Sequence, residues 1–167
     1  MNQTPIQFYP SGTLVALVGN PNCGKTALFN LLTGSRQKVA NYAGVTVGRK
    51  EGTYELNDGK KLRILDLPGT YSLYPRSPDE KVTCDVLAGK AKGEKKPDWA
   101  ICVVNATNLR RGLRLVLGVK RMGLPIVVAV NMMDVAARRG IQIDLLALSK
   151  ELGVPVVSTV GVKNDGA

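Results

Sequence analysis

Apolar residues along this chain follow two spacings in alternation. Short apolar runs of strand length recur between stretches whose apolar residues lie three and four apart, as in amphipathic helices. The runs predict strands at Leu14–Val18, Gly52–Leu56, Leu62–Asp66, Trp99–Val104, Ile126–Val130 and Val154–Val157. The helical stretches are Lys25–Thr33, Asp79–Leu87, Leu109–Arg121 and Leu145–Leu152. This alternation predicts an α/β fold with a doubly wound, mostly parallel six-stranded sheet, in a single domain over residues 1–167.

Turn and cap residues mark the ends of several predicted elements. Asn57–Gly59 between two strand runs predicts a hairpin, which makes the second strand the antiparallel edge of the sheet. Asn108 and Asp144 are the expected N-caps of the last two helices, and Gly123 and Gly153 are expected to end them.

Two connections lack a clear period. Ser35–Arg49 follows the first helix, and Thr70–Pro78 carries two prolines, so we expect both to be mobile. Beyond Val157 only ten residues remain, so we expect no closing helix over that face of the sheet.

The connection after the first strand carries the strongest chemical signal. Gly19–Thr26 fills the pattern G-x-x-x-x-G-K-[ST] at every fixed position, between a predicted strand and a predicted helix. Backbone N–H groups at a helix N-terminus bind phosphate because they lack intrahelical partners and lie at the positive end of the helix dipole. Lys25 is expected to reach the β- and γ-phosphates, and the Thr26 hydroxyl to ligate Mg²⁺. The loop therefore predicts binding of a nucleoside triphosphate.

A second motif, Asp66–Gly69, ends the third predicted strand. Ligands of open α/β sheets bind outside the carboxyl ends of the strands, so Asp66 is expected at the same edge as the phosphate loop. Asp66 can hold Mg²⁺ through water, and the Gly69 N–H can reach the γ-phosphate because no side chain blocks the approach.

Two later strands are each followed by a candidate base-reading segment. Asn131–Asp134 resembles the guanine-reading motif of GTPases, in which an Asp carboxylate accepts two N–H groups of the base. Met132 stands where lysine is usual, which leaves the preference for guanine open. Ser158–Val160 has the position of a loop whose backbone contacts the guanine oxygen.

Thr46 lies in one of the two connections that we expect to be mobile, within Gly44–Val47. A threonine there can ligate Mg²⁺ only when the γ-phosphate is present. Hydrolysis would then be coupled to the order of the connection.

Composition narrows the class of protein. Hydrophobic residues make up 44% and charged residues 22%, as in soluble globular proteins, and no apolar run is long enough to span a bilayer. The formal net charge is +10, but the basic residues are scattered along the sequence. That scatter favours a solvated basic surface over an anionic membrane or nucleic acid as partner.

The composition gives little support for a zinc or iron site or for a reactive cysteine. Histidine is absent, and Cys23, Cys84 and Cys102 lie far apart, which excludes the usual zinc and iron sites. Cys102 is expected in the core. Cys23 is expected to fill a small slot in the phosphate loop rather than to act as a reactive thiol.

Five segments together resemble the GTPase domain of the bacterial ferrous-iron transport (FeoB) family: Gly19–Phe29, Asn41–Val47, Asp66–Leu73, Ala106–Leu109 and Asn131–Asp134. The resemblance extends from about Thr13 to Gly161. It implies a P-loop GTPase with a Ras-like fold that slowly hydrolyses GTP to GDP and phosphate and regulates Fe²⁺ uptake. It also implies a place at the cytoplasmic face of the bacterial inner membrane. The partners there would be a helical spacer and a membrane transport domain, both absent from this chain, which alone would be a soluble cytoplasmic fragment. No specific nucleic acid is expected, and a homo-oligomer is left open.

The resemblance further implies activation by K⁺. Asn22 would ligate K⁺ together with backbone carbonyls of Ala40–Tyr42, and the cation would supply the charge that an arginine supplies in other GTPases. Thr70 has the position of the catalytic glutamine of Ras-like proteins but is too short to orient water. Cys23, Ala40, Tyr42 and Asn105 depart from the family's usual residues without removing a phosphate or Mg²⁺ contact.

The expected site joins residues from all these motifs. The catalytic set is Asn22, Lys25, Thr46 and Gly69. The nucleotide-binding set is Gly19, Asn20, Pro21, Asn22, Cys23, Gly24, Lys25, Thr26, Ala27, Gly44, Val45, Thr46, Asp66, Gly69, Asn131, Met132, Asp134, Ser158, Thr159 and Val160. The metal set is Thr26, Thr46 and Asp66 for Mg²⁺, with Asn22, Ala40 and Tyr42 for K⁺.

Three other interpretations remain open at this point. One is a GTPase of ribosome assembly or tRNA maturation. Another is a module that senses GTP or GDP with little hydrolysis. The third is a broader nucleoside triphosphatase, which Met132 would permit.

Overall fold

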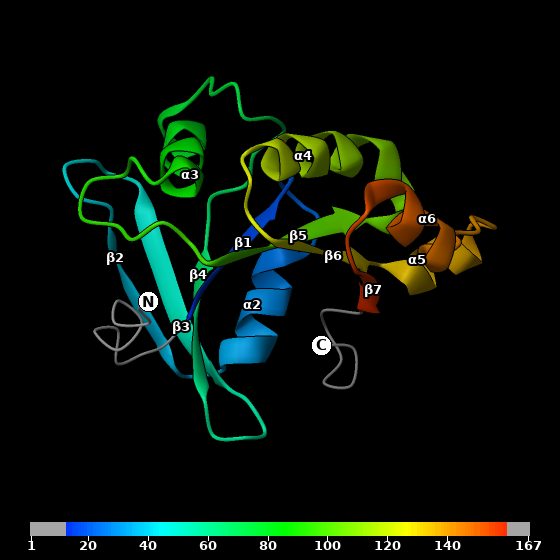
Figure 1. The fold of residues 1–167 in the computed structure, drawn as a ribbon, viewed down its shortest axis with the longest axis horizontal. Helices are drawn as coiled ribbons and strands as arrows, with labels where there is room; N and C mark the ends of the chain where they lie inside the picture. The colour runs from blue at the N-terminus through cyan, green and yellow to red at the C-terminus, as the bar shows by residue number, and fades with distance from the viewer. Residues whose placement is uncertain (1–12, 160–167) are drawn as a thin grey trace.

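A computed structural model describes residues 13–159 (Figure 1). In this part of the chain seven strands form one sheet, in the order β2-β3-β4-β1-β5-β6-β7. The parallel strands are β1 (Leu14–Gly19), β4 (Lys61–Asp66), β5 (Trp99–Asn105), β6 (Ile126–Asn131) and β7 (Val156–Thr159). Strand β3 (Gly48–Glu55) runs antiparallel to β4 and to the edge strand β2 (Gln37–Asn41). The predicted doubly wound α/β fold is confirmed.

The described sheet has one strand more than the six that the sequence predicts. Strand β2 lies within Ser35–Arg49, where we expected an irregular connection, and it moves β3 away from the predicted edge position. Four of the five β2 residues are exposed, so the strand has no buried face and no alternation of apolar and polar residues. Backbone pairing with β3 holds it in the sheet instead.

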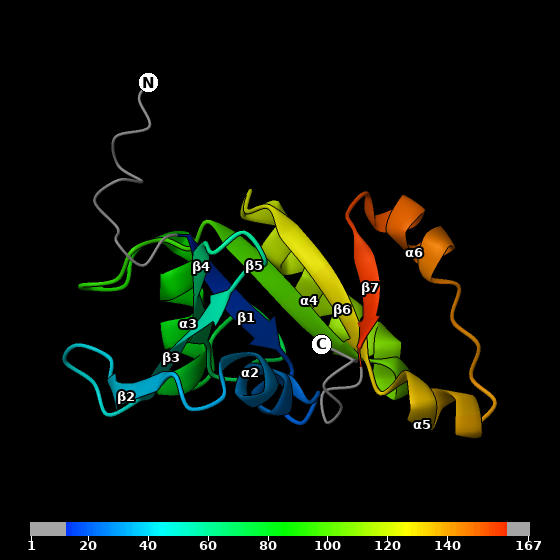
Figure 2. The same cartoon turned by 90° about the horizontal axis from the view of Figure 1, so that it is seen from below.

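Helices cover both faces of the sheet (Figure 2). Helix α2 (Lys25–Thr33) lies on one face, where Phe29 packs against Val15, Leu17 and Ile64. The other face is covered by α3 (Pro78–Ala88), α4 (Leu109–Arg121) and α6 (Leu145–Leu152), which contribute to the larger core cluster. Two short elements, the 3₁₀ turn η1 (Ala106–Asn108) and helix α5 (Met133–Arg138), follow β5 and β6. All four predicted helices are therefore confirmed, and α5 was missed because it has only six residues.

The predicted N-cap positions are confirmed, although one of the two lacks its side-chain hydrogen bond. Asp144 caps α6, since its carboxylate accepts the Ala147 N–H at 3.0 Å, and Gly153 ends the helix in the left-handed region. Asn108 has the predicted N-cap position of α4, but its side chain makes no capping hydrogen bond. Asn105 takes over the role at η1, where its side chain accepts the Thr107 N–H at 2.8 Å.

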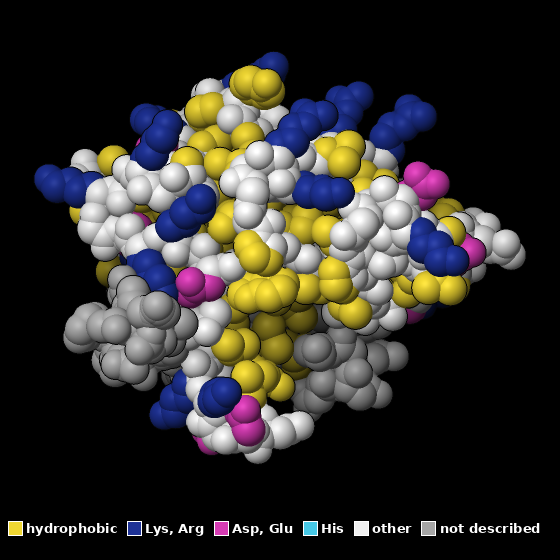
Figure 3. Space-filling model, in the orientation of Figure 1, with side chains coloured by type: hydrophobic (Ala, Val, Ile, Leu, Met, Phe, Trp, Pro, Cys, Tyr) yellow, Lys and Arg dark blue, Asp and Glu magenta, His cyan; other side chains and the backbone are white. Residues whose placement is uncertain are grey.

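A hollow of about 170 Å³ opens on the face that carries α2. Figure 3 shows it as a recess between the β3–β4 hairpin and the C-terminal end of the described chain, with hydrophobic side chains inside. Its lining includes Leu32, Ile101, Val127 and Val157, and Val157 is 47% exposed. No helix within residues 13–159 has the length and apolar character needed to cross a bilayer.

Strand register brings the chemistry-bearing residues to one edge of the sheet. Asp66 pairs with Leu17 near the end of β1, Asn105 pairs with Asn131, and Asn131 pairs with Thr159. Because these strands are parallel, their carboxyl ends meet at the same edge, beside the loop that follows β1. This edge is where the candidate site forms.

Candidate functional site

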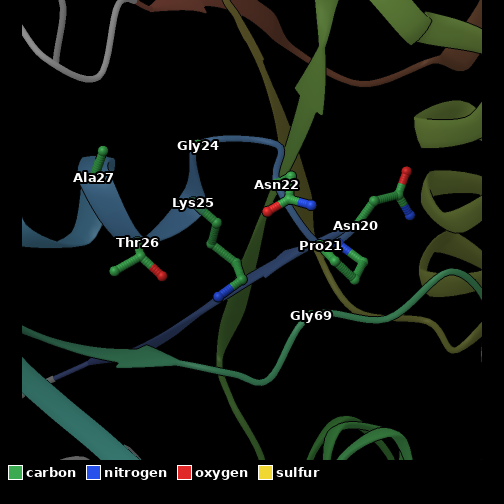
Figure 4. A pocket seen from close by; sticks show the side chains of 8 residues that line it. All are labelled: Asn20, Pro21, Asn22, Gly24, Lys25, Thr26, Ala27 and Gly69. Carbon is green, nitrogen blue, oxygen red and sulfur yellow. The ribbon is translucent and has the colours of Figure 1, made fainter.

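The loop between β1 and α2 wraps around a pocket of about 300 Å³ (Figure 4). Asn22 (φ 66°) and Gly24 (φ 90°) both have left-handed backbone conformations. Residues in that conformation turn successive N–H groups toward a common centre, which is the geometry of an anion-binding nest. Helix α2 begins without a side-chain cap, so its first N–H groups have no such partner. The lining is Asn20, Pro21, Asn22, Gly24, Lys25, Thr26, Ala27 and Gly69.

Lys25 and Asp66 form a buried ion pair at this pocket. The Lys25 Nζ donates a hydrogen bond to Asp66 Oδ1, and the two residues are 7% and 6% exposed. The carboxylate at the end of β4 therefore holds the ammonium group at the mouth of the loop. In Figure 4 the Lys25 and Thr26 side chains point to the same side of the loop, whereas Asn20 points away from them.

Hydrogen bonds clamp the turn after β4 to the phosphate loop. The Thr70 N–H donates to the Gly19 carbonyl at 3.0 Å, and Asn20 Nδ2 donates to the Thr70 carbonyl at 2.8 Å. A Cβ on Gly69 would lie 3.1 Å from the Pro21 Cα, so a side chain at position 69 would push the two segments slightly apart. The fully buried Thr70 hydroxyl donates to the Ser72 carbonyl at 2.6 Å. Its role in this structure is therefore to hold the turn.

Asn131 joins the candidate base-reading segment to the phosphate loop. Its Nδ2 donates to the Cys23 carbonyl at 3.1 Å, and its Oδ1 accepts the Thr159 hydroxyl at 3.4 Å. Both of these side-chain contacts are buried. A Cβ on Gly24 would lie only 2.1 Å from Asn131 Nδ2, so this contact needs glycine at position 24. We call the Asn131–Cys23 hydrogen bond the clasp.

The remaining base-reading residues flank the clasp. Met132 has a left-handed backbone (φ 65°) and caps α5, which places Asp134 in the first turn of that helix. The Asp134 side chain is 39% exposed and lies 3.7 Å from Arg138 Nη1, a weak surface contact that leaves it free to accept other donors. Ser158 is exposed next to Thr159, and Val160 lies outside the described residues.

Thr46 lies apart from this assembly. With Gly44 and Val45 it forms the exposed connection at the tip of the β2–β3 hairpin, which points away from the phosphate loop in both ribbon views (Figures 1 and 2). Ala40 pairs with Arg49 inside the hairpin. Neither these residues nor Tyr42 line the pocket.

Buried groups hold the hairpin next to its tip, just beyond the last β2–β3 pair, Asn41 and Gly48. Tyr42 is 4% exposed, and its hydroxyl has no hydrogen-bond partner among residues 13–159. Burial raises the pKa of the Tyr42 hydroxyl well above its ordinary range. Arg49 lies over the Tyr42 ring at 6.0 Å from its centroid. The same guanidinium binds Glu94 at 2.8 and 3.0 Å and Glu51 at 2.8 Å.

The Cys23 thiol has the properties of a packing residue. It is 3% exposed, and burial raises the pKa of the Cys23 thiol above its ordinary value of 9.0 despite the nearby Lys25. Cys102 is also buried, as predicted. Within the described part of the chain, no three His, Cys, Asp or Glu side chains gather into a metal-binding group.

Sequence reasoning placed the motifs at one edge but missed the bonds between them. Asn20 and Asn131 each bond a backbone carbonyl of a neighbouring loop, and Asn105 bonds a backbone N–H of its own turn. The signal in the sequence is an asparagine at the carboxyl end of three strands: Asn20 directly follows β1, and Asn105 and Asn131 are the last residues of β5 and β6.

The chain has close relatives. The family model described as "Ferrous iron transport protein B" matches residues 13–167. The Fe(2+) transporter FeoB of Escherichia coli (strain K12) is 47% identical over 157 residues, which cover 91% of this chain and 19% of that protein. The chain therefore spans about a fifth of the length of this curated relative.

Solved structures agree with the fold. The crystal structure of the G domain of the T. maritima FeoB iron transporter has a TM-score of 0.80 and 42% identity, over 92% of this chain and 91% of that chain. The cytosolic domain of T. maritima FeoB in GDP form I has a TM-score of 0.84 and 42% identity, over 92% of this chain and 58% of that one.

Proposed function

The chain belongs to the ferrous iron transport protein B (FeoB) family, and from this premise we propose that it binds guanine nucleotide and hydrolyses GTP to GDP and phosphate as the switch of a ferrous-iron transporter. The observation that carries the proposal is the buried Lys25–Asp66 pair beside a nest of backbone N–H groups. A cation held in place next to oriented donors suits a polyphosphate, because neither has to reorganise when the anion arrives. The GDP form of the T. maritima relative supports guanine as the base.

In the proposed reaction the loop amides bind the β-phosphate, and Lys25 stabilises the charge that develops on the oxygens between the β- and γ-phosphates. The Gly69 N–H contacts the γ-phosphate from the side of β4. Thr70 is already bonded to Ser72, so water must be oriented by backbone groups, which predicts slow turnover.

The residues present fit a Mg²⁺ ion. The Thr26 hydroxyl lines the pocket and has no hydrogen-bond partner among the described residues, and the Asp66 carboxylate lies on the same side of the loop. Hydroxyl and carboxylate oxygens are the ligands that Mg²⁺ takes beside nucleotide phosphates. When bound there, Mg²⁺ would neutralise charge on the phosphate oxygens.

A K⁺ ion fits this site only in part. The Asn22 side chain is exposed at the pocket and offers an amide oxygen, whereas Ala40 and Tyr42 lie in the hairpin away from it. We therefore propose that the hairpin tip swings toward the phosphates when GTP is bound. That movement would also bring Thr46 to the metal. The hairpin would then be ordered only while the γ-phosphate is present.

We propose that the base is held by Asp134, which accepts N–H donors of guanine, with Met132 and the segment after β7 at its sides. Adenine offers no matching pair of donors, so an Asp acceptor left unpaired would disfavour it. The clasp would keep this reading segment at a fixed distance from the phosphate loop.

The setting follows from the family. We propose that the domain acts at the cytoplasmic face of the bacterial inner membrane, joined through a helical spacer to the transport domain. Family membership favours this role over ribosome or tRNA maturation.

Phosphate release tests the enzymatic proposal. The chain is assayed with GTP and with ATP, each in KCl and in NaCl, beside Lys25→Ala and Asn22→Ala. We expect turnover with GTP that is faster in KCl, no turnover in Lys25→Ala, and loss of the K⁺ effect in Asn22→Ala with GDP affinity retained. A rate indistinguishable from buffer in both salts would favour a nucleotide-sensing module, and equal rates with ATP would favour a broader nucleoside triphosphatase.

A further inference from the structure

Helix α4 presents an arginine stripe to solvent. Arg110, Arg114, Leu117 and Arg121 follow one another at spacings of four, three and four residues, which aligns them along one side of a helix. All four are exposed. Basic residues that look scattered in the sequence are thus collected by the helical period.

No ion pair between described residues neutralises the charge on this stripe. Helix α4 contains no acidic residue, and no carboxylate in residues 13–159 pairs with Arg110, Arg114 or Arg121. Arg110 and Arg111 lie in the first turn, where positive charge opposes the helix dipole, and Arg110 repels Arg114 across one turn. Arg121 is favourably placed in the last turn, but the arginines near the start of α4 are unfavourable there, and an anionic surface would relieve their repulsion.

Apolar side chains lie beside the arginines. Tyr74 is 84% exposed, Tyr71 44% and Leu117 43%. The Arg111 guanidinium stands 4.9 Å from the centroid of the Tyr71 ring. In Figure 3 Lys and Arg side chains project along the upper edge over α4, with hydrophobic side chains among them.

A groove of about 580 Å³ runs between α4 and the segment after the Asp66–Gly69 motif. Its floor includes Leu73, Leu115 and Met122, and its rim includes Arg114 and Arg121. Glu80 also borders the groove; its carboxylate accepts the Arg76 N–H at 2.8 Å and lies 3.0 Å from the Thr70 hydroxyl, whose one hydrogen it shares with the Ser72 carbonyl. The apolar floor and the cationic rim of this groove suit a molecule that has a phosphate at one end and an apolar body.

We propose that this surface docks onto anionic phospholipid of the membrane. We call it the α4 face, and it consists of Arg110, Arg111, Arg114, Arg121, Tyr71, Tyr74 and Leu117. The inference rests on the proposed function, because a domain tied to a membrane transporter meets headgroups at high local concentration. Arginine binds phosphate oxygens through a two-pronged fork, and tyrosine lies at the level of the headgroups. Nucleic acid would use the arginines but would leave the exposed Leu117 and the apolar groove without a role.

Vesicle flotation tests the inference with the whole chain. Vesicles of phosphatidylcholine with about 30% phosphatidylglycerol model an anionic leaflet, and pure phosphatidylcholine vesicles serve as the neutral surface. We expect binding only to the anionic vesicles, weakened by added KCl. The triple change Arg110→Glu, Arg114→Glu and Arg121→Glu should weaken binding by about a hundredfold, since each cation near an anionic surface contributes about fivefold. The double change Tyr74→Ser and Leu117→Ser should weaken it less and leave the salt dependence unchanged.

A variant with the same change in net charge tests whether vesicle binding depends on the α4 face or only on the overall charge of the chain. Lys38→Glu, Lys60→Glu and Lys61→Glu change the charge equally at exposed positions on β2 and at the turn from β3 into β4, at the opposite end of the molecule from α4 (Figure 1). This variant should keep most of the vesicle binding. Equal losses in the two triples, or no binding of the unchanged chain to anionic vesicles, would overturn the inference. The inference would also be overturned if the chain bound a single-stranded RNA or an acidic protein through the same arginines but did not bind vesicles. GDP affinity is measured for the unchanged chain and for every variant. If none of them bound GDP, the proposed nucleotide function would be rejected, whereas the vesicle binding would still decide the lipid proposal.

Discussion

Replacing Gly24 with alanine tests the clasp between the phosphate loop and β6. The change acts in two ways. Gly24 has φ 90°, a conformation that alanine adopts at a cost of about 1–2 kcal/mol. The new Cβ would also meet Asn131 Nδ2 at 2.1 Å, so the amide must leave and the Cys23 carbonyl loses its partner.

The loss of the Asn131–Cys23 hydrogen bond sets the expected difference in the free energy of unfolding. A buried group left without its hydrogen bond costs about 1–3 kcal/mol, so the clasp should account for about 2 kcal/mol of the free energy of unfolding. The backbone strain is measured separately with Gly123→Ala, since Gly123 has φ 83° and nothing lies within 4 Å of its added Cβ. Gly24→Ala should therefore unfold about 4–8 °C below Gly123→Ala in a thermal melt without nucleotide.

Urea unfolding and calorimetry with GDP complete the test. Gly123→Ala should bind GDP like the unchanged chain, whereas Gly24→Ala should lose affinity because both the loop and Asn131 are displaced. Equal losses of stability in the two variants would show that the Asn131–Cys23 bond contributes nothing, and the account of the clasp would be wrong.

Three further outcomes follow from the site and the hairpin. Asp134→Ala should reduce the preference for GDP over ADP by about tenfold or more, since the lost acceptor no longer selects the base; unchanged selectivity in competition binding would remove Asp134 from the base site. Thr46→Ala should weaken a non-hydrolysable GTP analogue while GDP affinity stays the same, and a parallel drop in both affinities would contradict a γ-phosphate-dependent role. Arg63, which donates to Glu51 at 2.7 and 2.9 Å, holds the pKa of the Glu51 carboxyl below its ordinary value of 4.5. That stabilisation is present above pH 4.5 and disappears as the pH falls through the lower folded-state pKa, so Glu51→Gln should flatten this acid limb in urea melts; an unaltered limb would refute it.

The central part of the fold could be predicted because its signals are local. Strands β1, β5 and β6 are apolar runs buried on both faces, and α2, α4 and α6 each begin and end at the predicted residues. Strand β2 could not be predicted, because an exposed strand leaves no pattern in its own residues and depends on its neighbour for pairing.

The candidate site also has a part that the sequence predicts and a part that it does not. Lys25 and Asp66 could be placed together from two motifs and the rule that parallel strands end at one edge. The clasp joins residues 108 positions apart and depends on the depth at which β6 ends beside the loop, which no local pattern encodes. The alignment of the α4 arginines follows from the helical period of the predicted Leu109–Arg121 segment, which the sequence analysis did not apply to the basic residues.

Within the part of the chain that the structure describes, the buried Tyr42 hydroxyl has no hydrogen-bond partner, which affects the stability of the hairpin. A buried polar group without a bond raises the free energy of the arrangement that contains it. Any rearranged hairpin that returns this hydroxyl to water or to an acceptor recovers that free energy. If the hairpin moves on GTP binding as proposed above, this recovered free energy would supply part of what the bound triphosphate must otherwise provide.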